Sequence, residues 1–170
     1  SGSRRNVSMW EDWMAPASSL VRSSANSGRP TLGICFGHQL LCHALGAKVE
    51  RAESLSSGIW DLDFTDIGQD DELLTSHVSG DSTVAGLFTH QDHVINSGEM
   101  EIIGSAEHCK IAVCKHPTRP IRTVQFHPEA VNSVLEYSVE CGDMTKEERS
   151  AFGDGKQDLD VTESLILPKF

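Results

Sequence analysis

The segment 31-TLGICFGHQLL-41 constrains the fold more than any other part of the chain. Its first five residues form a short apolar run without helical period, which predicts a buried strand. Residues 38–45 then show a helical pattern, and Gly46 is a typical residue for the end of a helix. A strand that leads directly into a helix predicts an α/β fold, with Cys35 at the turn between the two.

Cys35 itself has two interpretations. Gly33 and Gly37 flank it in a G-x-C-x-G pattern, which is the nucleophile-elbow pattern with sulfur in place of oxygen. A helix that begins after the cysteine would direct its positive end at the sulfur and favour the thiolate. Free cysteines are, however, among the most buried residue types, so this segment alone is equally compatible with a core thiol.

A nucleophilic thiol needs a base, and the base needs a group that orients it. His127 follows the expected strand 121–126, so it should lie at the C-terminal edge of the sheet, as Cys35 does. Glu129 follows across Pro128, which stiffens the connection and lets the carboxylate hold one imidazole tautomer. The His-Pro-Glu tripeptide is weak evidence alone, and its value comes from the pairing with the cysteine elbow.

Other patterns along the chain agree with an α/β class. We expect a helix within residues 9–27, with Pro16 in its first turn and Leu20 and Val21 on its inner face. Apolar runs between short polar or glycine-containing turns predict strands. These runs are 47–51, 59–64, 83–88, 101–106, 110–115 and 121–126.

The remaining segments are less regular. Residues 66–72 are expected to form a solvated loop, and residues 127–140 a loop that leads into a helix. Thr145 and Glu148 resemble a capping box that opens another short helix. The apolar residues near 165–167 should dock on the fold at a position that the sequence does not give.

Length and charge limit the function. A chain of 170 residues predicts a single domain, 1–170, with a core in 1–140 and a C-terminal extension in 141–170. A net charge of -11 argues against a nucleic-acid partner and fits either ordinary solubility or a salt-rich cytoplasm. No apolar run approaches the roughly 18 residues of a membrane helix, and no signal peptide is present, so we expect a cytoplasmic protein.

The cysteine pattern gives no sign of a disulfide framework or a structural metal. Five cysteines are present, an odd number, and none forms a CxxC pair. His90 and His93 suggest a metal pair, but no third ligand has suitable spacing, so no metal is expected. His38 and His43 are expected to be helix-surface or core residues. Structural thiols are expected at Cys42, Cys109, Cys114 and Cys141.

The two motifs together resemble those of the class I (triad) glutamine amidotransferases. GICFGHQLL and VQFHPE are intact, in the family's order and about 90 residues apart. The resemblance covers residues 1 to about 137 and implies a flavodoxin-like, doubly wound mixed sheet without a cofactor. It implies that Cys35 attacks the glutamine side-chain amide, that His127 activates the thiol and protonates ammonia, and that Glu129 orients His127.

The resemblance also implies an oxyanion hole made of two backbone N–H groups. One comes from Phe36, directly after the nucleophile. The other falls in the opening SGSR segment, at Ser3. Family members commonly have Gly-Pro where this chain has Ser3 and Arg4, so the backbone conformation there can differ.

Substrate contacts follow from two further matches. Gln39 corresponds to the family glutamine that helps bind the amino-acid end of the substrate. The segment 89-THQDHV-94 resembles the family's Ser-His-Gly-Asp stretch, which lines the same pocket. This resemblance therefore implies that His90, Gln91 and Asp92 bind substrate, with Gln91 in the place of the family's glycine.

Three functions are compatible with these motifs. The leading one is glutamine hydrolysis that supplies ammonia to a GMP synthase-like synthetase in another chain, since this chain has no P-loop and no room for an ATP-binding domain. The second is a stand-alone γ-glutamyl peptidase, because GICFGHQ, LGAKVER and SGIWD also resemble plant-type γ-glutamyl peptidases. The third is a non-catalytic regulatory or binding subunit, against which the intact triad argues.

The opening of the chain departs from the family pattern. The family normally has about 50 residues ahead of the SGSR segment, with the first strands of the doubly wound sheet. We therefore expect an N-terminally truncated sheet. Unless another segment or subunit fills the gap, exposed apolar faces should make the polypeptide weakly active or prone to aggregate.

Overall fold

The structure, a computed structural model, describes residues 3–73, 84–130, 132–142 and 144–151. The expected docking of residues 165–167 lies outside the described residues. The elements in chain order are α1 (Met14–Asn26), β1 (Thr31–Ile34), α2 (Phe36–Ala44), β2 (Val49–Phe64), α3 (Asp66–Gln69), β3 (Val84–Val94), β4 (Glu101–Ala106), β5 (Cys109–Lys115), β6 (Ile121–Val124), α4 (Asn132–Glu140) and α5 (Lys146–Ala151). This order of helices and strands confirms the α/β class.

The described strands form one mixed sheet in the order β1-β6-β5-β4-β2-β3. β1 pairs with β6 in parallel, with Ile34 opposite Val124. The other neighbouring pairs are antiparallel. Because β1 and β6 run in the same direction and in register, residues 35 and 125–127 leave the sheet at the same edge. The topology thus brings the two sequence motifs together.

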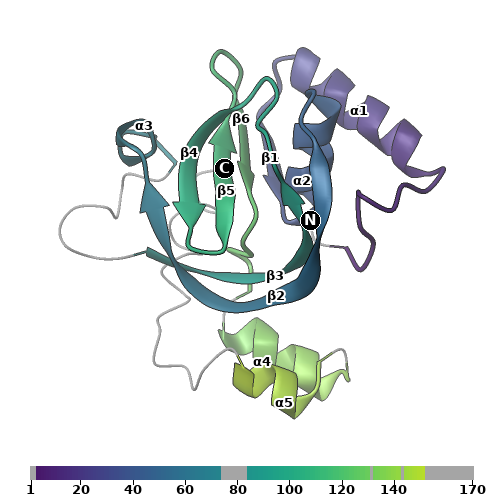
Figure 1. Cartoon of the computed structure of the whole chain (residues 1–170), viewed down its shortest axis with the longest axis vertical. Helices are drawn as coiled ribbons and strands as arrows, with labels where there is room; N and C mark the ends of the chain where they lie inside the picture. The colour runs from purple at the N-terminus through teal and green to yellow at the C-terminus, as the bar shows by residue number, and fades with distance from the viewer. Residues whose placement is uncertain (1–2, 74–83, 131, 143, 152–170) are drawn as a thin grey trace.

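The two faces of the sheet have separate apolar clusters. Ile121 of β6 and Cys114 of β5 join the cluster that contains Leu41 and Leu45 of α2. The same strands direct other side chains to the opposite face of the sheet. Val124, for example, joins the cluster around Phe88 and Phe126. Figure 1 shows α1 and α2 beside β1, and α4 and α5 below the curved pair β2 and β3. Both faces of the sheet are therefore buried, as the α/β reading requires.

The strands expected at 47–51 and 59–64 are one continuous strand, β2, of 16 residues. β2 pairs with β3 along nearly its whole length, with a register shift between Arg51 and Ser56. The polar segment between them has no apolar pattern of its own. Residues 56–58 of this segment pair with β3, so tertiary context overrides the weak local signal. β3 also extends to Val94, beyond the expected end at residue 88.

Helix α1 begins at Met14 and places Pro16 in its first turn, as expected. Its buried or partly buried positions are Met14, Ala17, Val21 and Ala25, which recur at helical spacing. The assignment of Leu20 to the inner face is wrong, because that side chain is 71% exposed. Position 20 lies next to the apolar stripe and just outside it.

The expected solvated loop at 66–72 is also wrong in part. Residues Asp66–Gln69 form the short helix α3, whose first turn is capped by Thr65 through a 3.2 Å bond from the Gly68 N–H. Asp71 is buried, and Arg122 of β6 pairs with it at 2.8 Å. A distant cation gives this acidic residue a partner, which a local reading could not detect.

The helices near the end of the described chain agree with expectation. α4 follows the His-Pro-Glu turn, and its Leu135 packs with Leu87 of β3. α5 begins directly after Thr145. None of the helices in the described ranges combines the length and apolarity that crossing a membrane requires.

Candidate active site

Cys35 lies at the strained turn between β1 and α2. Its backbone has φ 49° and ψ −105°, and no other non-glycine residue in the described ranges has a positive φ. Its N–H bonds to the Val124 carbonyl at 2.9 Å, which fixes the turn to the end of β6. Such strain persists only where the surroundings enforce it, and it is concentrated at functional positions. The backbone therefore favours the nucleophile-elbow interpretation over the core thiol.

His127 leaves the sheet beside this turn. Its N–H bonds to the Leu87 carbonyl at 2.8 Å, and its carbonyl accepts from the Ala130 N–H at 3.1 Å. Its Nδ1 donates to Oε1 of Glu129 at 2.9 Å. Because a carboxylate only accepts, the proton lies on Nδ1 and the buried Nε2 is left as the basic nitrogen.

The charge state of this pair follows from its neighbours. Burial lowers the pKa of His127, but interactions with Cys35 and Glu129 outweigh it and raise that pKa to about 10. Burial raises the pKa of Glu129, but the bond and charge of His127 outweigh this and lower it. His127 therefore holds firmly a proton that it takes from the thiol, and Glu129 stays ionised beside it.

Cys35 interacts electrostatically with His127 but has no hydrogen bond of ordinary geometry with it. The Sγ atom of Cys35 donates instead to the Thr89 carbonyl at 3.8 Å. Nε2 of His127 has no hydrogen-bond partner in the described part of the chain. Catalytic hydrogen bonds are often long before substrate binds.

Both groups open into a cavity of about 530 Å³. Its other walls come from the N-terminal segment, β2 and β3. The residues that line it are Ser3, Arg4, Asn6, Cys35, Arg51, Leu55, Thr89, His90, Gln91 and His127. A concave site with a few convergent polar groups beside a thiol and an imidazole is suited to a small polar substrate.

Of the two residues expected to supply oxyanion-hole donors, Ser3 lines the cavity and Phe36 directly follows Cys35. Phe36 is the first residue of α2, where backbone N–H groups have no acceptor within the helix. Ser3 lines the cavity, and its Oγ accepts from the Arg5 N–H at 3.0 Å. These positions allow one donor from each side of the cavity.

The four expected substrate-binding residues divide into two groups. His90 and Gln91 line the cavity, whereas Gln39 and Asp92 lie buried behind it. Gln39 Nε2 donates to the Asp92 carbonyl at 3.0 Å, and the Asp92 carboxylate accepts from the Ser8 N–H and hydroxyl at 2.7 Å each. Gln39 and Asp92 therefore connect α2, β3 and the N-terminal segment.

Two arginines in the cavity are absent from the expected set. Arg51 of β2 bonds through its guanidinium to Gln91, and Arg4 lies in the N-terminal segment. Guanidinium groups are the usual partners of carboxylates. The nearby Ser3-Arg4 departure from the family pattern is a sequence signal for Arg4, but Arg51 has none, because only the curvature of β2 brings it to the site.

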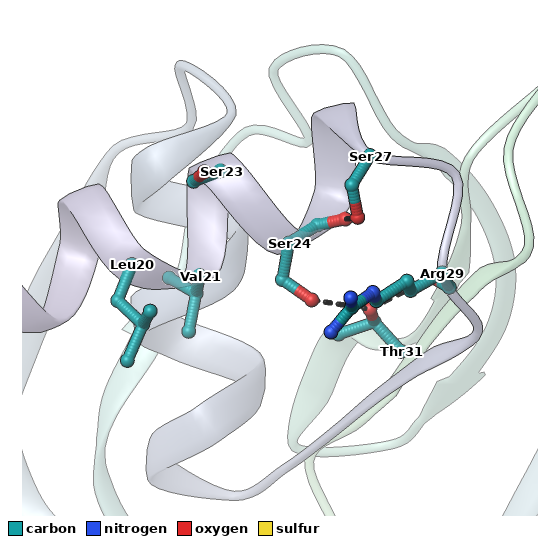
Figure 2. A pocket seen from close by; sticks show the side chains of 7 residues that line it. All are labelled: Leu20, Val21, Ser23, Ser24, Ser27, Arg29 and Thr31. Carbon is teal, nitrogen blue, oxygen red and sulfur yellow. Dashed lines mark hydrogen bonds between the residues drawn. The ribbon is translucent and has the colours of Figure 1, made fainter.

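A second cavity, of about 570 Å³, lies between α1 and β1. Figure 2 shows its walls, which include exposed Leu20, several serines and Arg29, with Ser24 and Thr31 joined by a hydroxyl contact of 3.5 Å. The residues that line it include no thiol, imidazole or carboxylate. The smaller cavity at Cys35 is therefore the candidate active site.

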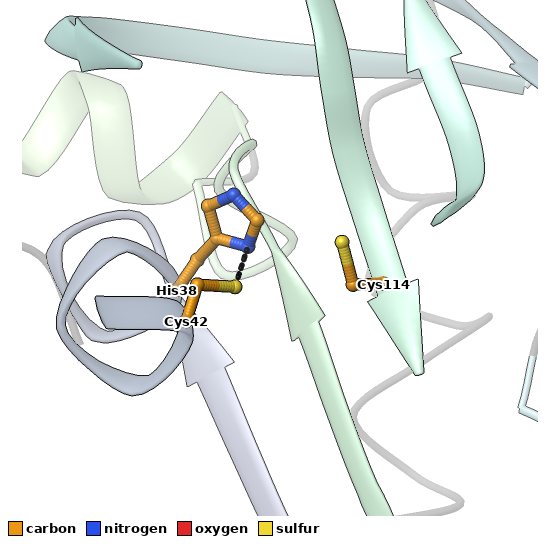
Figure 3. A group of neighbouring side chains, drawn as sticks. All are labelled: His38, Cys42 and Cys114. Carbon is orange, nitrogen blue, oxygen red and sulfur yellow. Dashed lines mark hydrogen bonds between the residues drawn. The ribbon is translucent and has the colours of Figure 1, made fainter. Parts of the chain in front are cut away.

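The structure also brings together two groups that could hold a metal. One consists of His38, Cys42 and Cys114 (Figure 3). The other adds Cys109 to His90 and His93, so the expectation that the histidine pair lacks a third ligand is wrong. Burial lowers the pKa of His90 to about 3 and raises that of Cys109 to about 12.

Comparisons with known proteins identify the family of this chain. The family model described as glutamine amidotransferase class-I matches residues 9–139. A glutamine-hydrolyzing GMP synthase subunit from Methanocaldococcus jannaschii is 33% identical over 118 residues, which cover 69% of this chain and 60% of that protein. The protein of the same name from Methanococcus aeolicus is 34% identical over 66% of this chain and 57% of its own length. The chain thus spans about three fifths of these relatives.

Solved structures show the same fold. A glutamine amidotransferase of Thermotoga maritima has a TM-score of 0.73 at 18% identity, covering 96% of this chain and 68% of its own. A second, from Methylobacillus flagellatus, has a TM-score of 0.70 at 17% identity, covering 98% and 66%. These likenesses confirm the expected flavodoxin-like α/β fold.

Proposed function

The chain belongs to the class I glutamine amidotransferase family, and from this premise we propose that it hydrolyses L-glutamine to glutamate and ammonia. The supporting observation is the strained Cys35, with φ 49°, in one cavity with the His127–Glu129 pair. A nucleophile, a base and a group that orients the base are the parts that acyl transfer from an amide requires.

The acylation step uses Cys35 and His127. Nε2 of His127 accepts the thiol proton, and the sulfur attacks the side-chain amide carbon of glutamine. The N–H groups of Phe36 and Ser3 stabilise the oxyanion, which is worth roughly 10²–10³ in rate per donor. The carbon–nitrogen bond then breaks, and His127 passes its proton to the leaving ammonia, which leaves a glutamyl thioester on Cys35.

The deacylation step repeats this chemistry with water. Neutral His127 removes a proton from the water as its oxygen attacks the thioester carbon. The carbon–sulfur bond breaks, and the proton returns to the sulfur, which releases glutamate. Glu129 stays ionised throughout, holds the proton of Nδ1 and stabilises the imidazolium that forms in each step.

Substrate recognition is assigned to the cavity walls. Arg4 and Arg51 supply positive charge for the α-carboxylate of glutamine, and His90 and Gln91 provide further contacts. Gln39 acts as a positioning residue, because its bond to the Asp92 carbonyl fixes β3 behind the cavity. Asp92 anchors the segment that carries Arg4 through its bonds to Ser8.

The ammonia is proposed to pass to a separate synthetase chain. The relatives named as subunits of GMP synthase support a GMP synthase-like partner. The family match at 9–139 supports one amidotransferase-like domain in 1–170, with the motifs in 1–140 and an extension in 141–170.

The test measures glutamate release from L-glutamine and from γ-glutamyl dipeptides, and ammonia release from L-glutamine, with and without the ATP-binding subunit of a GMP synthase. Wild type should release ammonia from glutamine, and Cys35→Ala should not. Release from dipeptides only would replace the proposal with a γ-glutamyl peptidase. No turnover of either substrate, alone or with the synthetase subunit, would indicate a non-catalytic subunit.

A further inference from the structure

A second set of reactive side chains adjoins the candidate active-site cavity through His90. His90 and His93 come from β3, and Cys109 begins β5. One ligand atom from each lies within 4.8 Å of those from the other two. His90 lines the cavity, while Cys109 is only 1% exposed. Neither His93 nor Cys109 has a part in the proposed hydrolysis.

His90 is held in the tautomer that binds a cation. Its Nδ1 lies 3.0 Å from the Asp92 carbonyl oxygen, and a carbonyl can only accept, so Nδ1 carries the proton and Nε2 the lone pair. Nε2 is buried and has no partner in the described chain, in a residue only 5% exposed. A backbone carbonyl that fixes the other ring nitrogen is the usual support of a metal-bound histidine.

His93 and Cys109 are placed to complete the site. The rings of His93 and His90 have centroids 4.6 Å apart in an edge arrangement, so their nitrogens can converge on one point. Cys109 Sγ has only a weak contact of 3.6 Å, to the Ile111 carbonyl. A buried thiol of this kind becomes a thiolate when a cation binds beside it.

We propose that His90, His93 and Cys109 bind a zinc ion beside the candidate active-site cavity. Two imidazole nitrogens and one thiolate suit zinc in charge and softness. Zinc bond lengths place such ligand atoms about 3.3–3.6 Å apart in a tetrahedron, so the three ligand atoms, which lie within 4.8 Å of one another, need shifts of roughly 1 Å to complete the geometry. Water supplies the fourth ligand, because His90 borders the open cavity.

The other histidine–cysteine group is less suited to a metal. Figure 3 shows Cys42 beside Nδ1 of His38, with Cys114 across from them on β5. That Nδ1 already forms a 2.9 Å hydrogen bond with the Thr123 hydroxyl. All three residues are fully buried, so solvent has no direct access to supply a fourth ligand. This group serves as the comparison site in the test.

The test uses the full chain, freed of metal with a chelator and then titrated with Zn²⁺ or Co²⁺. Elemental analysis after desalting should find one zinc per chain in wild type. His93→Gln and Cys109→Ser should each weaken binding at least about tenfold, because even outer-shell partners are worth 10–100-fold. Cobalt-loaded wild type should show sulfur-to-cobalt charge-transfer absorption, which Cys109→Ser should lack.

Two variants locate the ion by exclusion. Cys35→Ala removes the catalytic thiol, and Cys42→Ser removes a thiol of the comparison site; both should keep the zinc and the cobalt absorption. Loss of zinc in either variant, with retention in His93→Gln, would overturn the proposal, as would a folded wild type that binds no zinc. If Cys109→Ser does not fold, His93→Gln decides alone, because its side chain is only half buried.

Discussion

A Cβ atom on Gly33 would lie 2.7 Å from the carbonyl oxygen of Gly37. Strand β1 and the first turn of α2 therefore approach too closely for any side chain at position 33. The contact is with backbone, so no rotamer change could relieve it. This approach is what turns the chain at Cys35 and gives that residue its positive φ.

Gly33→Ala should therefore damage both stability and activity. The added Cβ would force the backbones of β1 and α2 apart, which should cost about 1–3 kcal/mol of unfolding free energy. Displacement of the elbow should lower kcat by roughly 10²-fold, because misplacement near 1 Å has effects of that size. Urea denaturation and glutaminase assays on folded protein would measure the two effects.

Gly28→Ala is the matched control for this change. Gly28 has φ 73° at the end of α1, and nothing lies within 4 Å of an added Cβ. Because alanine is strained at this positive φ, Gly28→Ala should cost about 1 kcal/mol of unfolding free energy and leave kcat unchanged. Equal losses of kcat in both variants would contradict a specific role for the Gly33–Gly37 contact.

Cys35→Ala should lower glutamine turnover by at least about 10³-fold, since the thiol forms the covalent intermediate. A glutamine-like chloroketone should modify Cys35 in wild type, as peptide mass spectrometry would show. Cys141→Ala removes an exposed thiol and should change neither turnover nor labelling of Cys35. Inactivation that follows modification of Cys141 would count against the elbow.

Glu129→Gln should lower the pKa of His127 from about 10 and reduce kcat by roughly 10²–10⁴-fold. Because its pKa is raised, His127 contributes fully to folding stability below about pH 6.5, and this contribution is lost as pH rises through about 10. Because its pKa is lowered, Glu129 contributes to folding stability above pH 4.5, the ordinary pKa of a glutamate, and this contribution is lost as pH falls below that value. Imidazole proton NMR against pH would follow the change.

The charge-matched control for this titration is Glu136→Gln, on the exposed side of α4. Removal of the Glu136 carboxylate should leave the titration midpoint of His127 within experimental error of wild type. A His127 midpoint that is the same in wild type and in Glu129→Gln would show that the 2.9 Å bond does not set the charge of the imidazole.

Arg122→Met should destabilise the fold by about 2–3 kcal/mol. It leaves the buried Asp71 carboxylate without its 2.8 Å cation, and the cost falls below that of a fully buried pair because Arg122 is 22% exposed. Arg5→Met breaks the exposed Arg5–Glu11 contact and should cost under about 1 kcal/mol. Equal midpoints of thermal unfolding for the two variants would contradict the burial argument.

Local sequence was sufficient for much of the site. The apolar run, the glycines around Cys35 and the helical pattern after it are short-range signals, and they placed β1, the turn and α2 correctly. His127 followed from the same reasoning applied to β6. The family match at 9–139 agrees with the resemblance that these two motifs carry.

Local sequence failed where distant strands supplied the partner. Residues 56–58 joined β2 because β3 pairs with them, and Asp71 was buried because Arg122 neutralises it. Arg51 reached the cavity through the curvature of β2. Cys109 joined His90 and His93 through the packing of β5 beside β3, which their spacing along the chain does not indicate.

The motifs were sufficient to propose the reactive groups: the thiol of Cys35 at a strand-to-helix turn, and an imidazole with a carboxylate two residues away. The groups that surround them depend on contacts between distant parts of the chain. The parallel register of β1 and β6 set Cys35 beside His127, and the long β2–β3 pair closed the cavity with arginine and histidine. The reason is physical: turns and helices follow from neighbouring residues, whereas sheet pairing joins residues whose separation along the chain carries no signal.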